Sequence, residues 1–168
     1  MAGIIFGNIC SFLATITDSI SSTRKTVKGV LGMQCLSQII FIVVSIAFQG
    51  YADLVQNVVG LVRNLFAMSK KQVKGIEWVF VTLAVGLGLW FNNLGWLGLL
   101  PVLANFEYSL AVFRFADDER AMKVAFAVMN LLYMVYNFCM LNVVGGVCSA
   151  VVIVTTVIYL VKNKKSAA

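Results

Sequence analysis

Polar and apolar positions follow a helical pattern over residues 51–66. The polar or small positions, at i, i+3, i+4, i+7, i+10 and i+11, are Asp53, Gln56, Asn57, Gly60, Arg63 and Asn64. This spacing places them in one stripe of an α-helix. The sequence on either side is far more apolar. In a membrane, such a stripe needs a bundle interior, a water-filled cavity or a substrate to face.

Apolar runs separated by short connections predict seven membrane-spanning helices, because a span needs about 20 mostly apolar residues. The runs are 3–20, 28–49, 51–68, 76–93, 95–114, 121–139 and 141–162. The first has a polar face and could instead be an amphipathic helix at the membrane surface, but basic residues are missing from that face. The fourth has almost no polar residues, which favours a lipid-facing or connecting helix.

Basic residues give the expected orientation. They cluster at 24–28, 70–74, 114–123 and 162–165, whereas the N-terminus and the other three connections contain no Lys or Arg. With seven spans, every cluster lies on one side of the membrane, and the positive-inside rule makes that side cytoplasmic. The N-terminus is then outside and the C-terminus inside.

The first three and last three spans have similar layouts, each with a basic loop and a tight turn near Gly. Without gaps, residues 24–28 overlie 119–123, and Gly50 overlies Gly145. We therefore expect an all-α integral membrane fold of two three-helix bundles joined by a linker helix (3+1+3). The expected parts are a first bundle, a linker, a second bundle and a cytoplasmic tail, at 1–68, 69–94, 95–163 and 164–168.

Composition supports a membrane protein without a soluble domain. The chain is 61% hydrophobic and 12% charged, and its mean hydropathy is +0.93. The net charge of +6 does not indicate nucleic-acid binding, because the basic residues lie between apolar runs. Histidine is absent, and the four cysteines show no metal-ligand spacing. We expect no metal, no cofactor and no enzymatic activity, since no nucleophile motif is present either.

Several short segments resemble a known family. They are residues 57–64 (NVVGLVRN), 99–102 (LLPV), 136–138 (YNF) and Gly145-Gly146. In layout the chain resembles the SWEET and PnuC type of small-solute facilitators, and more specifically the YgjV-type bacterial inner membrane proteins. The resemblance covers nearly the whole chain. It implies the fold and a bacterial inner (plasma) membrane, but little about chemistry.

Seven polar residues inside the spans are candidate solute contacts: Gln38, Gln56, Asn57, Arg63, Asn105, Glu107 and Asn137. Amides donate and accept hydrogen bonds, which suits uncharged polar solutes, although they can also simply join helices. Arg63 either neutralises an acidic group or extends to the cytoplasmic headgroups. Glu107 either couples protons or binds a cation, or it forms a structural pair, for example with Arg63.

Three other residues have expected roles, and only Pro101 belongs to the expected site. Asp18 and Asp53 lie near helix ends, so we expect them at the membrane interface. Pro101 is the only proline, and it can kink span five as a hinge or as a static bend.

The expected function is passive or ion-coupled movement of a small polar solute across the lipid bilayer. The alternative is a non-transporting interaction or regulatory protein, whose polar stripes would hold helices or partners together. The sequence leaves open whether the protein acts alone or as a homo-oligomer, because seven helices can close a path by themselves.

Overall fold

The computed structural model describes residues 2–69, 73–115 and 117–164. Lys70, Lys71, Lys165 and most of the expected tail lie outside these ranges. The described residues form seven helices and no strand. The helices are α1 (Ala2–Thr23), α2 (Val27–Ala47), α3 (Tyr51–Met68), α4 (Ile76–Trp90), α5 (Trp96–Arg114), α6 (Glu119–Cys139) and α7 (Val143–Lys164).

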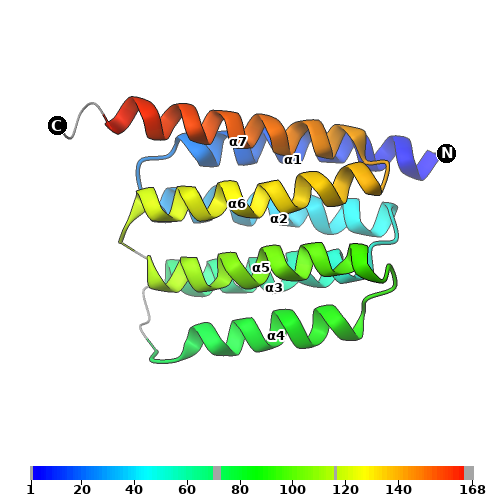
Figure 1. The fold of residues 1–168 in the computed structure, drawn as a ribbon, viewed down its shortest axis with the longest axis horizontal. Coiled ribbons are helices and arrows are strands. Elements are labelled where there is room, and N and C mark those ends of the chain that lie inside the picture. The colour runs from blue at the N-terminus through cyan, green and yellow to red at the C-terminus, as the bar shows by residue number, and fades with distance from the viewer. Residues whose placement is uncertain (1, 70–72, 116, 165–168) are drawn as a thin grey trace.

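Six helices form two layers, and the remaining one lies along an edge (Figure 1). One layer is α1, α2 and α3, and the other is α7, α6 and α5. The layers meet where α1 packs on α7 and where α3 packs on α5, so the six helices close into a ring. Helix α4 packs against α3 and α5 outside this ring.

Three phenylalanines fix α4 to the ring. They are Phe66 on α3, Phe80 on α4 and Phe113 on α5. The centroids of their aromatic side chains lie 5.5–6.4 Å apart. Such aromatic contacts add to the burial of apolar area. No α4 side chain among the described residues lines the central cavity introduced below. Within the described structure, α4 therefore braces the α3–α5 edge.

The outside of the molecule is apolar. Every helix carries large exposed apolar side chains, for example Val58, Val62 and Leu65 on α3. Five helices (α1, α2, α5, α6 and α7) are long and apolar enough to cross a membrane by themselves. Of the seven spans predicted, α3 is excluded from this set by its polar stripe, and α4 is short at 15 residues.

Side-chain hydrogen bonds define the ends of several helices. Thr26 and Asp118 accept hydrogen bonds from backbone amides in the first turns of α2 and α6. Asn142 does the same for α7, since its Oδ1 accepts from Gly145 N at 3.0 Å. Asn142 Nδ2 also donates to Ser11 on α1 (3.0 Å) and to Asn137 on α6 (2.9 Å). One side chain thus joins three helices.

We expect Asn142→Ala to lower the free energy of unfolding by about 2 kcal/mol, because a cap and two buried hydrogen bonds are lost. The matched control is Thr26→Ala, which removes an exposed cap and should cost about 1 kcal/mol. Unfolding in mixed detergent micelles measures both. Equal losses would mean that the bonds from Asn142 to α1 and α6 contribute nothing.

Candidate functional site: a polar cavity inside the helix ring

The polar stripe of α3 faces the interior of the ring. Asp53, Gln56, Asn57, Arg63 and Asn64 are all buried. The opposite side of the helix is exposed and apolar. The helix therefore presents its apolar side outward and its polar side to the other helices, as the sequence pattern indicates.

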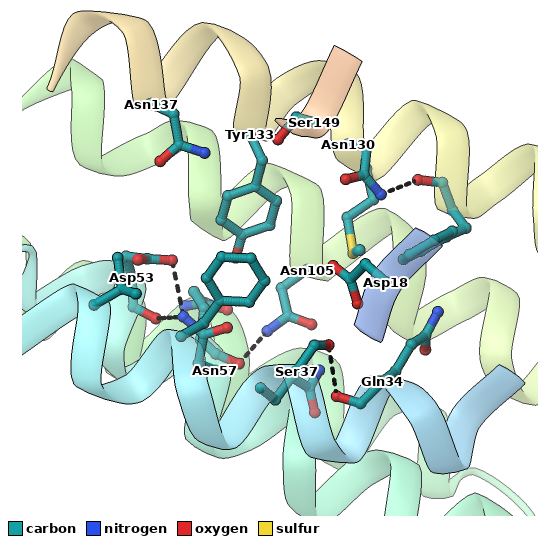
Figure 2. Close-up of a pocket in the computed structure, with 16 residues that line it drawn as sticks. Asp18, Gln34, Ser37, Asp53, Asn57, Asn105, Asn130, Tyr133, Asn137 and Ser149 are labelled. Carbon is teal, nitrogen blue, oxygen red and sulfur yellow. Dashed lines mark hydrogen bonds between the residues drawn. The ribbon is translucent and has the colours of Figure 1, made fainter. Parts of the chain in front are cut away.

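A cavity of about 50 Å³ lies between the two layers. Its polar lining comes from all six ring helices: Asp18 (α1), Gln34, Ser37 and Gln38 (α2), Asp53, Gln56 and Asn57 (α3), Asn105 (α5), Asn130, Tyr133 and Asn137 (α6) and Ser149 (α7). Figure 2 shows labelled members of this lining, such as Tyr133 and Asn57, reaching toward one another from the two layers. A cavity needs about 10–15 Å³ of such space to hold one water molecule, so this cavity has room for a guest of a few non-hydrogen atoms.

Asp53 is held in place by neutral donors. Ser45 Oγ donates to its Oδ2 at 2.6 Å, and Asn57 Nδ2 donates to its Oδ1 at 3.1 Å. Tyr133, from the opposite layer, interacts with the same carboxylate. The carboxylate of Asp53 is therefore fixed at the cavity wall without a positive charge in direct contact.

Arg63 joins α3 to α5 beside the cavity. Its Nη1 donates to Ser109 Oγ at 2.9 Å and to Asn105 Oδ1, and its Nε donates to Asn64 Oδ1 at 3.0 Å. The guanidinium also lies over the Tyr108 ring, 4.9 Å from its centroid. Arg63 is fully buried, and its Nη2 has no hydrogen-bond partner. We call these five residues the Arg63 clamp.

An apolar cluster closes the cavity toward the end of the ring that carries the basic residues. This apolar plug consists of Leu31, Tyr108, Ala111, Val112, Met122, Ala125, Phe126 and Val152. Phe126 also lines the cavity, whereas Leu31 and Val112 line a vestibule of about 860 Å³ on the far side. Lys25, Lys28 and Lys74 are at the rim of that vestibule. The plug therefore separates the vestibule from the cavity.

Polar contacts close the ring at its other end. The Tyr136 hydroxyl packs so closely on Gly50 that a Cβ at position 50 would overlap it. Asn142 bridges Asn137 and Ser11 in the same region. The two ends of the cavity are thus closed by chemically different layers.

Comparison with known proteins identifies the family of this chain. Residues 5–167 match a family model described as a bacterial inner membrane protein. The chain belongs to the YgjV family. No curated protein and no solved structure matches it. Family membership and the apolar exterior place the protein in a bacterial inner membrane.

Five of the seven predicted contact residues of this YgjV-family chain lie at the cavity: Gln38, Gln56, Asn57, Asn105 and Asn137. Arg63 and Glu107 do not line it. Arg63 is buried in the clamp, so its side chain does not extend to the headgroups. Glu107 is half-buried and lines a shallow groove between α5 and α6. No ion pair links Glu107 to Arg63; in the described part of the chain, the one ion pair is Lys123–Glu119.

The expectation that Asp18 and Asp53 lie at the membrane interface is wrong. Each is only 6% exposed, and both line the cavity. Their distance from the helix ends is short along the chain, but α1 and α3 turn these side chains toward the interior of the ring. Asn130 and Tyr133 were missing from the predicted contacts, although their spacing from Asn137 (i, i+3, i+7) indicates one side of the same helix.

Proposed function

We propose that this protein is a facilitator or transporter of a small polar solute, which passes between the two layers of the helix ring. The observation that carries the proposal is the central cavity, which all six ring helices line with polar side chains in an otherwise apolar chain. Polar groups inside a membrane span are costly, and a polar interior is typical of solute pathways. The solute has only a few non-hydrogen atoms, in keeping with the cavity's volume.

The proposal includes two three-helix repeats with α4 as the linker. Two matched features support it: the caps Thr26 and Asp118, and the left-handed turn residues Gln49 and Leu141, are each 92 positions apart. Helices α2 and α6 overlie fully at this shift. The register differs by three positions from the overlay of the basic loops. At a shift of 92, Gln38 corresponds to Asn130, so the two halves supply matching amides to the cavity.

The orientation follows from the same layout. Three connections and the C-terminal end of α7 lie at one end of the ring, and the N-terminus lies at the other (Figure 1). The described lysines and arginines of these connections gather at the former end, which we assign to the cytoplasm. Pro101 is buried inside α5, and we assign it as the hinge that lets this helix bend when the path opens.

Solute flux through liposomes tests the function. Reconstituted vesicles should swell faster than protein-free vesicles in an inward gradient of urea, formamide or glycerol, as followed by stopped-flow light scattering. Asn130→Leu should slow the swelling about tenfold by removing one polar contact. Leucine keeps the number and branching of the side-chain heavy atoms but is larger, and Asn130 donates only to Phe126 O in its own helix.

The control for flux is Val128→Leu, on the exposed side of the same helix, which should leave swelling unchanged. If the folded wild-type protein conducted none of the three solutes and no ion, the transport proposal would be wrong. The polar stripes would then be better explained by an interaction or regulatory role, with capture of a protein partner as the next measurement.

A further inference from the structure

The Ser45 hydroxyl lies within hydrogen-bond distance of two other oxygen atoms. Its Oγ is 2.6 Å from Asp53 Oδ2 and 2.7 Å from the backbone oxygen of Phe41. Both distances are normal for an O–H···O bond with its own hydrogen, and oxygens this close repel when no hydrogen lies between them. A serine hydroxyl has one hydrogen and a backbone oxygen has none. The second hydrogen can therefore come only from Asp53.

The other oxygen of Asp53 is bonded as the carbonyl oxygen of a neutral carboxyl group. Asn57 Nδ2 donates to Asp53 Oδ1 at 3.1 Å and to the backbone oxygen of Asp53 at 3.0 Å, which uses both amide hydrogens. With a hydrogen on Oδ2, Asp53 donates to Ser45, and Ser45 donates to Phe41. Every donor in this chain of bonds then has its own acceptor.

No cation reaches this carboxyl group to offset a negative charge. Asp53 is 6% exposed, and the one ion pair of the described residues is Lys123–Glu119. Arg63 is on the same helix as Asp53, but it directs Nε and Nη1 to neutral oxygens of the clamp. Burying an unpaired carboxylate costs far more than burying the neutral acid. The charge environment therefore agrees with the hydrogen count.

Two tyrosines of α6 are the titratable groups that face Asp53. Tyr133 interacts with its carboxyl group, and the Tyr136 hydroxyl packs on Gly50 nearby. Asp18 contacts Ser37, which is eight residues or about 12 Å along α2 from Ser45. The described helices that pack on α3 hold their titratable groups elsewhere: Lys28 and Glu77 at the vestibule, Glu107 in the outer groove, Cys35 and Tyr108 beside Arg63, and Arg114 over Trp78. Since Tyr133 belongs to the opposite layer, separating the layers removes its contact and admits water to Asp53.

We propose that Asp53 carries a proton in this closed ring and releases it to water when the two layers separate, so that opening of the path is coupled to one proton. This rests on the proposed function, because it assigns the ion that accompanies solute movement through the same cavity. The O–H bond of Asp53 breaks, water takes the proton, and the carboxylate keeps the electron pair. An aspartic acid in water ionises near pH 4, so the open path loses the proton at neutral pH. The closed ring holds one proton more than the open one, and a lower pH therefore favours closure.

Infrared spectroscopy of the reconstituted protein at neutral pH tests the proton directly. The C=O stretch of a protonated carboxyl group lies apart from the bands of carboxylates and of the backbone, and it shifts in D₂O. The difference spectrum between the wild type and Asp53→Asn should contain one such band. Asp117→Asn, which removes an exposed carboxylate at the vestibule, should leave the band in place. If Asp53→Asn does not fold, ¹³C-labelled aspartate in the wild type should shift the band, and Asp18→Asn should retain it.

The pH dependence of solute flux tests the coupling. Vesicles with equal pH on both sides are placed in an inward urea gradient at several values from about pH 5 to about pH 9. Swelling should speed up with rising pH by up to about tenfold per unit where Asp53 titrates, because one proton is released on opening. Asp53→Asn resembles the protonated form, so it should swell slowly and without pH dependence. Asp117→Asn should follow the wild type.

The two measurements separate this inference from the transport proposal. Absence of a protonated aspartate band, or its loss only in Asp18→Asn, would overturn the proton site. Urea flux that still responded to Asn130→Leu would then leave the transport proposal standing. A wild-type flux independent of pH would overturn the coupling. A band from Asp53 in a folded protein that conducts no solute would refute transport but not the proton on Asp53.

Discussion

Replacing Arg63 with leucine should lower the free energy of unfolding by about 4 kcal/mol. The guanidinium is fully buried and makes three hydrogen bonds within the clamp, including those to Asn105 and Ser109 on α5. Bonds to charged groups contribute about 1.5–3 kcal/mol each, and leucine leaves the buried oxygens unpaired. Unfolding in mixed detergent micelles, followed by tryptophan fluorescence, measures the loss.

Two variants make the Arg63 result specific. Arg63→Lys keeps the charge but lacks the planar fork, so it should recover less than half of the lost stability. Arg120→Leu removes an exposed arginine from the first turn of α6 and should change stability by less than about 0.5 kcal/mol. Full stability of Arg63→Leu would show that the clamp does not hold α3 to α5.

Gly88→Ala should destabilise the protein by about 2–3 kcal/mol through overpacking. A Cβ at this position would overlap Gln56 Nε2 and lie 2.6 Å from Val102 Cγ2. Val102 is β-branched and buried, so it has little freedom to move. The same methyl group would also displace the Gln56 side chain from Ala84. The loss should appear in the same unfolding measurement.

The control for Gly88 lies two residues away on the same helix. A Cβ at Gly86 would meet no atom within 4 Å. Gly86→Ala should therefore stabilise α4 by up to about 1 kcal/mol, because alanine is the better helix former. Combining Gly88→Ala with Val102→Ala should recover part of the loss. If Gly86→Ala and Gly88→Ala behaved alike, close contact of α4 with the ring would be ruled out.

Local pattern was sufficient to predict the helices. Every predicted end lies within three residues of the observed one, and α3 spans Tyr51–Met68 as predicted. Apolar runs and turn residues determine these boundaries along the chain. The inward direction of the α3 stripe was also predictable, because a stripe of this kind has only one polar environment available in a membrane.

The composition of the site was less predictable, because a stripe defines a side of a helix but not the neighbour it meets. Arg63 and Asn57 share the α3 stripe, yet one contacts α5 and the other lines the cavity. Glu107 is a different case. It lies two residues from Asn105, which is about 200° around the helix, so both could not face one cavity. The sequence contained that information. Asp18 lies on the polar face of the first span with Ser11 and Thr15, which are buried with it, so the argument used for α3 also predicts its burial.

The two places where the layers meet are held by chemically different contacts. Arg63 and Thr155 correspond at the shift of 92 proposed for the repeats. Arg63 makes several charged hydrogen bonds at the α3–α5 edge, whereas Thr155 shares one neutral contact with Ser22, at 3.2 Å, at the α1–α7 edge. Only the first edge is braced by α4. If the layers rotate about the braced α3–α5 edge, two similar halves produce an asymmetric motion, and opening at the α1–α7 edge must break the bonds from Asn142 to Ser11 and from Val144 N to Asn8.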